Sequence, residues 1–337
     1  MLESRKSRVL AAALGGCGIA GLALLLVHLH RAGTAHASPV PELLAALPSG
    51  APTLVYLDLA AVRASSFYQH RPDRGPIAVP DKDYAKFVQS TGFDFEKDLD
   101  RVAVASWPPA AKEPAKTVAV ADGRFDRKKI REYATKEGKI DHQEGREVYL
   151  FPAQKQGGWN SLTFLDNHRV ALVEGPTIAP VLATHTNDSA GDPARERAAR
   201  FDGAAAFAIT RVPAITDNLA AGGMRSTQLA SLARSVQWVT LAARPEGDNL
   251  RVALEGECDN DTDARQLQSE VELLRMFGRA GLDNPKTRQS TDPAAYSVLH
   301  AMLDSADVTQ VGERVRILVE LTPDILKLKL GENRKPQ

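Results

Sequence analysis

VAVADGRFDRKKIREYATKEG, residues 118–138, contains the pattern on which the fold depends. Valines alternate with alanines at its start, which predicts a half-buried β-strand. The acid–glycine pair Asp122–Gly123 follows this strand. Asp126 then stands where a helix N-cap is expected, and Gly138 stands where that helix is expected to stop. The stretch therefore predicts a strand that leads directly into a helix.

The same pattern occurs a second time further along the chain. RVALEGECD (251–259) aligns with VAVADGRFD (118–126), so that Glu255–Gly256 matches Asp122–Gly123. Two further pairs align in the same order, and the opening strands TLVYLDLAAV and AAFAITRVPAI match more loosely. The further pairs are DLDRVAVAS (98–106) with SVQWVTLAA (235–243), and DNHRVALV (166–173) with VGERVRIL (311–318). Blocks that recur in one order predict a tandem duplication.

The expected fold class is α+β: an N-terminal transmembrane helix followed by two tandem, similar α+β repeats with largely antiparallel sheet. Strands are predicted over 53–59, 102–105, 118–121, 238–242 and 315–321. Hairpin turns are expected at 245–249 and at Asp166–Asn167, residues that tolerate positive φ. The expected parts are 1–31, cytoplasmic stub and membrane helix; 32–40, spacer; 41–185, first repeat; 186–200, linker; 201–330, second repeat; and 331–337, tail.

Two helices are expected in the second repeat. The first begins with Asp261 or Thr262 as N-cap, and Gly281 is its expected stop. Its expected apolar face consists of Leu267, Val271, Leu274 and Phe277. The second helix is capped by Asp292, with Pro293 in its first turn and Tyr296, Leu299 and Leu303 facing inward.

Composition and charge are those of an ordinary globular protein. The 337 residues are 43% hydrophobic and 25% charged, which is enough apolar material for a core. Formal net charge is zero, from 42 Lys and Arg against 42 Asp and Glu, so nothing in the charge favours nucleic acid as a partner. The two cysteines, Cys17 and Cys258, lie in different kinds of segment and predict no disulfide framework.

The N-terminal segment predicts a membrane anchor. Val9 to Val27 are nineteen consecutive residues without a charge or a hydroxyl. As a helix they would span about 28 Å, close to the roughly 30 Å hydrocarbon core of a bilayer. Three cations precede the run and one follows it, which predicts a cytoplasmic N-terminus and an extracytoplasmic body. These cations are Arg5, Lys6 and Arg8 before the run, and Arg31 after it.

Three interpretations of this segment remain open. An uncleaved signal anchor over residues 9–30 fits the length of the run and is favoured. Ala35 and Ala37 have the small-x-small form of a signal peptidase site, so secretion after cleavage near residue 37 is the alternative. LGGC (14–17) resembles a lipobox loosely. All three place the body in the periplasm or cell envelope.

One segment has part of the spacing of a calcium-binding loop. In DNDTDARQLQSE, Asp259, Asp261 and Asp263 occupy positions 1, 3 and 5, and Glu270 occupies position 12. Position 6 is Ala264, where the sharp turn of the loop requires glycine. Acidic residues at the start of a helix are the favoured explanation. We therefore expect neither a metal nor another cofactor here.

No residue pattern identifies a reaction. The sequence contains no H-E-x-x-H, G-x-S-x-G, S-x-x-K or P-loop pattern. The leading hypothesis is a non-enzymatic single-pass envelope protein whose exported, duplicated domain binds a partner or ligand. The alternatives are an envelope hydrolase whose site leaves no local motif and a lipid- or lipoprotein-handling module. The expected partners are the membrane and an envelope protein or a lipid.

Four blocks of the sequence resemble a set of uncharacterised bacterial exported or membrane-anchored proteins with a duplicated α+β domain of unknown function. The blocks are LPSGAPTLVYLDLAAVR (47–63), GFDFEKDLDRVAVA (92–105), ADGRFDRKKI (121–130) and LDNPKTRQ (282–289). The resemblance covers nearly all of residues 41–328. It implies an N-terminal anchor and a duplicated architecture, and it brings no catalytic residues.

Overall fold

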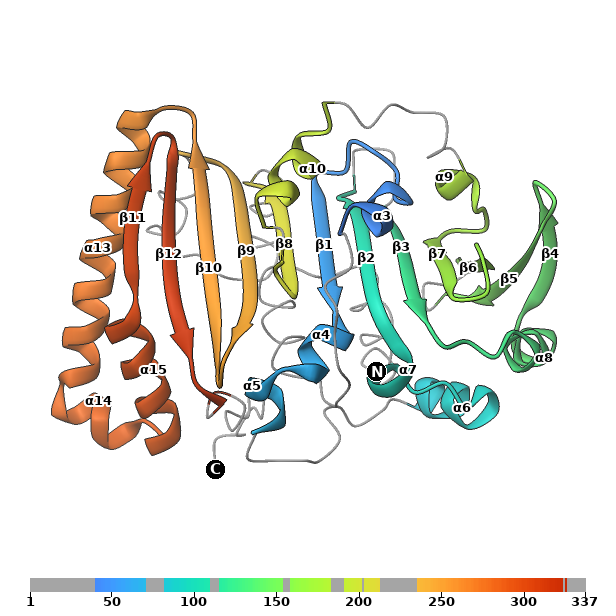
Figure 1. The fold of residues 1–337 in the computed structure, drawn as a ribbon, viewed down its shortest axis with the longest axis horizontal. Coiled ribbons are helices and arrows are strands. Elements are labelled where there is room, and N and C mark those ends of the chain that lie inside the picture. The colour runs from blue at the N-terminus through green and yellow to red at the C-terminus, as the bar shows by residue number, and fades with distance from the viewer. Residues whose placement is uncertain are drawn as a thin grey trace, which may run out of the picture. The chain divides into compact units, whose positions relative to one another are not determined.

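The computed structural model describes residues 40–70, 82–109, 115–153, 158–182, 191–201, 203–212, 235–323 and 325. It is a mixed α+β protein with antiparallel β-sheet, which confirms the expected class (Figure 1). The described residues divide into two compact units. Unit 1 contains residues 40–61 and 82–209, and unit 2 contains residues 62–70 and 210–325. The short helix α4 (Leu59–Ala64) and strand β8 (Ala206–Arg211) lie at the sequence boundaries between the units.

Unit 1 is built on a sheet with the strand order β8–β1–β2–β3–β7–β6–β5–β4. From β1 to β4 every pair of neighbours is antiparallel. The bounds are β1 Thr53–Asp58, β2 Leu99–Trp107, β3 Lys116–Gly123, β4 Lys139–Gln143, β5 Arg146–Pro152, β6 Trp159–Phe164 and β7 Arg169–Glu174. The strands predicted around residues 53–59, 102–105 and 118–121 are therefore confirmed.

The helices of unit 1 are short. Their bounds are α3 Val40–Ala45, α6 Lys82–Thr91, α7 Phe95–Asp98, α8 Arg127–Glu137, α9 Ala179–Leu182 and α10 Pro193–Ala198, followed by the 3₁₀ turn η2 Ala199–Phe201. The backbone amide of Lys129 donates to the Asp126 carboxylate, as expected of an N-cap, and Gly138 is the C-cap. Helix α8 packs against β4, β5 and α6.

An aromatic core lies beneath α8. Ile130 and Ala134 of α8 are buried with Tyr149 and Phe164 of the sheet. Phe87 of α6 packs its ring edge-on against Tyr133 of α8, with 5.3 Å between the ring centroids. Apolar burial of this kind supplies most of the stability of a short helix, because an isolated helix of this length is marginal in water.

Unit 2 is built on a smaller sheet with the strand order β11–β12–β10–β9, also antiparallel throughout. The bounds are β9 Val236–Glu246, β10 Asn249–Cys258, β11 Asp307–Val311 and β12 Arg314–Leu321. The hairpin predicted at 245–249 is confirmed: β9 and β10 pair across it, and Gly247 supplies the positive φ of the turn. The helices are α5 Ser66–Gln69, α13 Asp261–Asp283, α14 Pro285–Ser290 and α15 Pro293–Ser305.

Helix α13 differs from its prediction in three respects. Its N-cap is Asn260, whose side chain accepts from two backbone amides, rather than Asp261 or Thr262. It continues through Gly281 to Asp283 and stops at Asn284. Asn284 has an extended backbone because Pro285 follows it, and a residue before proline avoids the α region.

The third difference concerns its apolar face. Leu267 is buried and Val271 packs against the same core, but Leu274 and Phe277 are exposed. The helix is about 35 Å long, whereas β11 beside it spans only about 17 Å. The second half of α13 packs instead on α14 and α15 (Figure 1). In α15 Val298 is buried and Leu299 is 40% exposed, so the predicted inward position of Leu299 is also wrong.

The aligned sequence blocks fall on corresponding strands of the two units. The blocks pair β2 with β9, β3 with β10 and β7 with β12, and both sheets place these strands in the same order. Asp122 faces Arg169 across β3 and β7, and Glu255 faces Arg316 across β10 and β12. The sequence alignment matches Arg169 with Arg314, two residues away. A shift of two keeps every side chain on its face, so alternation alone does not define the register.

The predicted membrane segment, 1–31, and the spacer residues 32–39 lie outside the described residues. So do residues 186–190 of the predicted linker and the tail, 331–337. In the part of the chain that the structure describes, no helix has the length and apolar character needed to cross a membrane.

Candidate functional site

The described part of unit 1 contains an open polar cleft of about 530 Å³. The ends of β2, β3 and β7 form it together with the turn before β7. The cleft is lined by Asp100, Arg101, Asp122, Gly123, Arg124, Asp166, Asn167, His168 and Arg169. Three guanidinium groups and three carboxylates thus meet in one place.

Asp122 is the centre of this cleft. Its side chain is only 9% exposed, and it stands directly opposite Arg101 on β2 and Arg169 on β7. Arg169 donates from Nε and Nη2 to the two carboxylate oxygens, at 2.6 and 3.0 Å. Arg101 Nη2 lies 2.9 Å from Oδ2. These charge-assisted contacts join three adjacent strands through one carboxylate.

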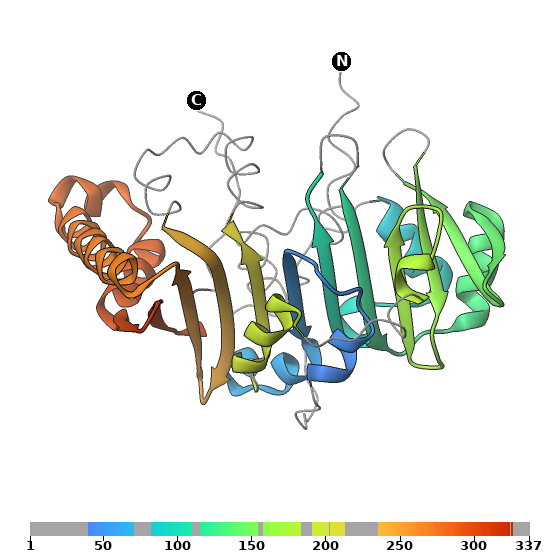
Figure 2. The same ribbon diagram turned by 90° about the horizontal axis from the view of Figure 1, so that it is seen from above.

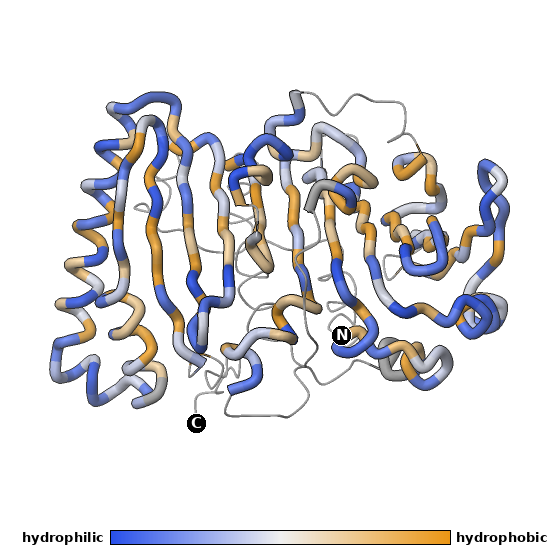
Figure 3. The backbone as a smooth tube through the Cα atoms, in the orientation of Figure 1, coloured by the Kyte–Doolittle hydropathy of each residue, from blue (hydrophilic) through white to orange (hydrophobic). Residues whose placement is uncertain are grey.

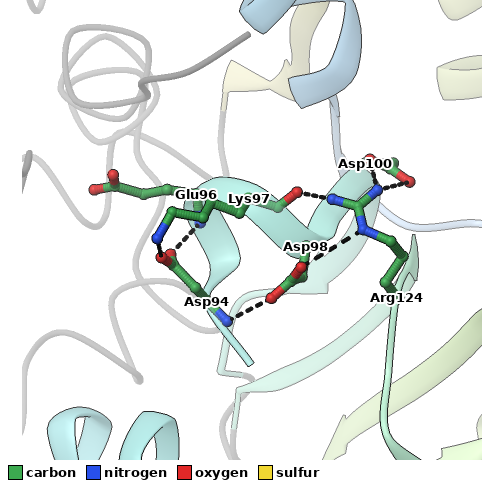
Figure 4. Close-up of polar contacts among 6 residues, drawn as sticks. All are labelled: Asp94, Glu96, Lys97, Asp98, Asp100 and Arg124. Atoms are coloured by element: carbon green, nitrogen blue, oxygen red, sulfur yellow. Dashed lines mark hydrogen bonds and ion pairs between the residues drawn. The ribbon is translucent and has the colours of Figure 1, made fainter. Parts of the chain in front are cut away.

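Arg124 forms a second set of polar contacts at the rim (Figure 4). Its guanidinium lies between Asp98 and Asp100, with Nη1 3.3 Å from Asp100 Oδ1 and Nε 3.5 Å from Asp98 Oδ1. It also donates to the backbone carbonyl of Lys97. Asp94 caps α7 by accepting from the backbone amide of Glu96. Arg124 thereby ties the loop after β3 to the end of α7.

Two backbone features shape the floor of the cleft. The Asp166 carboxylate accepts from the backbone amides of His168 and Arg169, at 2.7 and 2.8 Å, and so closes the turn before β7. Neither Asp166 nor Asn167 adopts the positive φ that these residue types tolerate. A Cβ at Gly123 would lie 2.4 Å from the carbonyl oxygen of Asp98. The backbone at Asp98 can therefore come this close to position 123 only because that residue is glycine.

Two basic groups of this region have raised pKa values. The hydrogen bonds that Arg169 donates to Asp122 raise the pKa of the Arg169 guanidinium above its ordinary value. The hydrogen bond to Asp94 likewise raises the pKa of the exposed Lys97 ammonium. Each guanidinium in the lining contacts a carboxylate of the lining. The cleft is therefore a neutralised network that braces β2, β3 and β7, not a set of unpaired charges directed at a ligand.

Unit 2 has a corresponding contact at the corresponding place. Glu255 on β10 is 2% exposed, and Arg316 on β12 lies opposite it. Arg316 donates to Glu255 Oε2 from Nη2 at 2.7 Å and from Nε at 3.2 Å. The Arg316 side chain is 42% exposed, so this pair is wetter than the one around Asp122. Each unit thus has an acid–arginine brace across matching strands.

The structure separates the four carboxylates of the predicted calcium loop. Asp259 accepts from Gln237, Asp263 accepts from Asn260, and Glu270 accepts from Gln266 two turns along α13. Helix begins at Asp261, so these residues do not form a twelve-residue loop. Among the described residues no cluster of three or more His, Cys, Asp or Glu side chains has an arrangement suited to a metal ion.

The remaining predicted site residues belong to the N-terminal segment and lie outside the described residues. They are Arg5, Lys6, Arg8, Val9, Val27 and Arg31 of the predicted anchor, and Ala35 and Ala37 of the possible cleavage site. Cys258, in contrast, lies within the described residues. It is buried at the end of β10, and burial raises the pKa of its thiol to about 11, which keeps it a protonated, unreactive core residue.

A second surface feature lies on the second half of α13. Leu273, Met276 and Phe277 are 49%, 62% and 64% exposed. With Ala280 they follow the spacing i, i+3, i+4, i+7, which places them on one side of the helix. In the first half the same stripe consists of polar residues, namely Thr262, Gln266 and Ser269. We call the apolar part, Leu273, Met276, Phe277 and Ala280, the outer face of α13.

Sequence reasoning missed both features, although the sequence contains a signal for each. The sequence alignment matches Asp122 with Glu255 and Arg169 with Arg314. Alternation alone does not reveal that the acid on one strand faces an arginine on the neighbouring strand. Along α13 a second apolar stripe begins at Leu273, beside the expected stripe that contains Leu267 and Val271. A helix that is apolar on two sides signals either a buried helix or an additional contact surface.

No protein-family model matches the chain, and no curated protein matches it in sequence. Among solved structures the chain is similar to crystal forms of TP0453, a Treponema protein. Crystal form III has a TM-score of 0.48 and 12% identity, over 87% of this chain and 100% of that chain. Crystal form IV has a TM-score of 0.47 and 11% identity, over 85% and 94% of the two chains.

Proposed function

We propose that the chain is a non-enzymatic, single-pass cell-envelope protein whose extracytoplasmic body binds a partner through the outer face of α13. Residues 9–30 anchor it, and Arg5, Lys6 and Arg8 hold the N-terminus in the cytoplasm. The observation that carries the binding role is the exposure of Leu273, Met276 and Phe277 on one side of α13. Contiguous apolar surface rimmed by polar residues is typical of an interaction site.

The anchor is supported by the length and flanks of the apolar run. Nineteen uncharged residues match the thickness of a bilayer, whereas the apolar core of a cleavable signal is about 7–15 residues long. The excess of cations before the run favours export of everything after it. Cleavage near Ala35–Ala37 is the alternative, and it would release the same body into the periplasm.

The duplicated architecture is part of the proposal. It is supported by the matching order of β2, β3 and β7 with β9, β10 and β12. It is supported further by the acid–arginine brace, which joins β3 to β7 in unit 1 and β10 to β12 in unit 2. We infer that the two units descend from one ancestral unit and that the second acquired the longer helix.

The polar cleft does not favour the hydrolase alternative. Asp122 accepts from Arg169 and contacts Arg101, and Asp100 contacts Arg124. A general acid or base must be free to exchange a proton with a substrate. A carboxylate engaged by two arginines is suited to holding strands together.

The anchor and its orientation are tested with the full chain carrying a C-terminal tag in a bacterium with two membranes. We expect the tag in the membrane fraction after a carbonate wash. We also expect it to be degraded by added protease once the outer membrane has been permeabilised. A matched variant replaces Lys6 and Arg8 with glutamate and so removes most of the excess of positive charge before the apolar run. In this variant we expect a larger fraction of the tag to be protected from protease.

Two results would contradict the proposal in different ways. Release of a soluble, tagged body that lacks the first 37 residues would establish cleavage and remove the anchor. Protection of the wild-type tag from protease in permeabilised cells would reverse the orientation, and the body would then lie in the cytoplasm.

A further inference from the structure

The outer face of α13 is held in a fixed position by contacts on the other side of the helix. A Cβ at Gly278 would lie 3.5 Å from the Leu303 side chain of α15, so this side of the helix faces α15. Arg275 pairs with Glu272 and donates to the backbone carbonyl of Ala306. The second half of α13 is therefore docked on α15, and its apolar side chains point away from that contact.

Basic side chains follow this apolar stripe along the chain, together with the exposed Asp283. Arg279 lies one turn along the helix, pairs with Asp304 at 3.0 Å, and is 54% exposed. Lys286 and Arg288 follow on α14, and both are exposed. Long basic side chains can lay their stems on an apolar surface while their charged ends reach phosphate groups. An apolar stripe of Leu, Met and Phe beside Lys and Arg is the composition of a helix that lies in a membrane interface.

The size of the stripe argues against a stable protein interface. Three large side chains at half to two-thirds exposure present about 300–400 Å². A standard protein–protein interface needs about 800 Å² from each partner. The outer face alone is therefore too small to hold a second copy of this chain, but it is large enough for shallow contact with a surface to which the protein is already tethered.

We propose that the outer face of α13 rests on the surface of the bilayer in which residues 9–30 are anchored; this inference depends on the proposed anchor. The spacer, residues 32–40, can reach at most about 30 Å when extended, so the body stays close to the lipid headgroups. Tethering makes the contact intramolecular, and a weak patch then suffices. Leu273, Met276 and Phe277 enter the interface, and Arg279, Lys286 and Arg288 contact lipid phosphates.

The test uses the full chain with Cys17 replaced by serine, reconstituted in vesicles of phosphatidylethanolamine and phosphatidylglycerol. A polarity-sensitive fluorophore is attached at Met276→Cys. The matched control carries it at Ser269→Cys, two turns earlier on the same side of α13 and exposed. Buried Cys258 does not compete for the label. Lipids bearing a nitroxide quencher should reduce the fluorescence at position 276 about twofold more than at position 269.

A second variant keeps the result specific. Phe277→Glu in the chain labelled at 276 should return quenching to the level at 269, because a carboxylate does not enter the interface. Equal quenching at 276 and 269 in chains that stay with the vesicles would overturn the inference and leave the anchor standing. So would disulfide cross-linking of Met276→Cys between copies, because a second copy would then cover the face. Chains lost from the vesicles in a carbonate wash would refute the anchor, and the inference with it.

Discussion

Helix α8 of unit 1 and helix α13 of unit 2 follow corresponding strands and begin in the same way. Each comes a few residues after an acid–glycine pair at or near the end of its strand. Each is capped by a side-chain oxygen, from the Asp126 carboxylate or the Asn260 amide. Each then buries an apolar stripe against its own sheet. The local chemistry of the strand-to-helix junction is therefore the same in both units.

The two helices differ in length and in their outer surfaces. Helix α8 has 11 residues and α13 has 23. The outer surface of α8 is charged, with Arg127, Lys128, Lys129 and Arg131 all exposed, and the helix is hydrophilic over most of its length (Figure 3). Helix α13 has a polar outer side only in its first half and an apolar one afterwards. Figure 2, seen from above, shows α13 as the long helix of unit 2.

The comparison separates two determinants of a helix. A cap and a buried stripe decide where the helix begins and which side faces the sheet. They do not decide how far the helix extends or what its outer side does. The outer side of α8 is charged and exposed to solvent. The outer face of α13 is apolar, and it is the part of this molecule that we assign to binding.

The largest predicted effect distinguishes the two braces. Asp122→Asn removes a buried charge shared by Arg101 and Arg169, and we expect it to lower the free energy of unfolding by about 3–5 kcal/mol. Glu255→Gln weakens the contact with Arg316, which is 42% exposed and can be solvated, so a smaller loss of about 1 kcal/mol is expected. Urea unfolding followed by tryptophan fluorescence measures both. Equal losses would mean that the solvent exposure of the paired arginine is unimportant.

The next prediction compares an inward and an outward side chain of the two helices. Ile130 of α8 is 1% exposed, and Ile130→Ala should cost about 2–5 kcal/mol of stability. Phe277 of α13 is mostly exposed, and Phe277→Ala should change stability by less than about 0.5 kcal/mol. Thermal or urea unfolding of the two variants checks this. A large loss at Phe277 would show that the outer face is a structural contact and not a binding surface.

Much of this fold could be predicted from residue alternation. The strands around 53–59, 102–105, 118–121, 238–242 and 315–321, the hairpin at 245–249 and the cap at Asp126 all follow from local patterns. Local patterns suffice for these elements because each depends on residues within a few positions of one another. The α+β class follows from the mixed order of the elements.

The errors arise where distant residues decide the outcome. Leu274 and Phe277 were expected to be buried, but β11 is too short to cover the second half of α13. The candidate site escaped prediction for a related reason. Asp122, Arg101 and Arg169 come from three strands, and only the register between those strands shows that they meet. Register depends on pairing across the sheet, which a period of two residues does not specify.

A smaller effect is expected at the two N-caps, where the helices are alike. Asp126→Ala and Asn260→Ala should each cost about 1 kcal/mol, because each leaves backbone amides of the first turn without an acceptor. Serine at either position should restore most of the loss. Urea unfolding of the four variants provides the measurement. A much larger loss at Asn260 would show that its contact with Asp263 contributes as well.

The last comparison concerns the glycines at which the sequence predicts that both helices stop. Gly138 does end α8, and a Cβ there would lie 2.2 Å from the carbonyl oxygen of Leu150. Gly281 lies inside α13, and a Cβ there would meet no other atom within 4 Å. Glycine in an exposed helix is less favourable than alanine because the unfolded chain gains more freedom from it.

Gly281→Ala should therefore raise the free energy of unfolding by about 0.5–1 kcal/mol, whereas Gly138→Ala should lower it by about 1–3 kcal/mol. Urea unfolding of the two variants beside wild type gives both signs in one experiment. Opposite signs would establish that a glycine ends a helix here only where neighbouring backbone excludes a side chain. A loss of stability at Gly281 would instead show that the bare surface near the outer face of α13 is required for packing, and the assignment of that side of the helix to binding would have to be withdrawn.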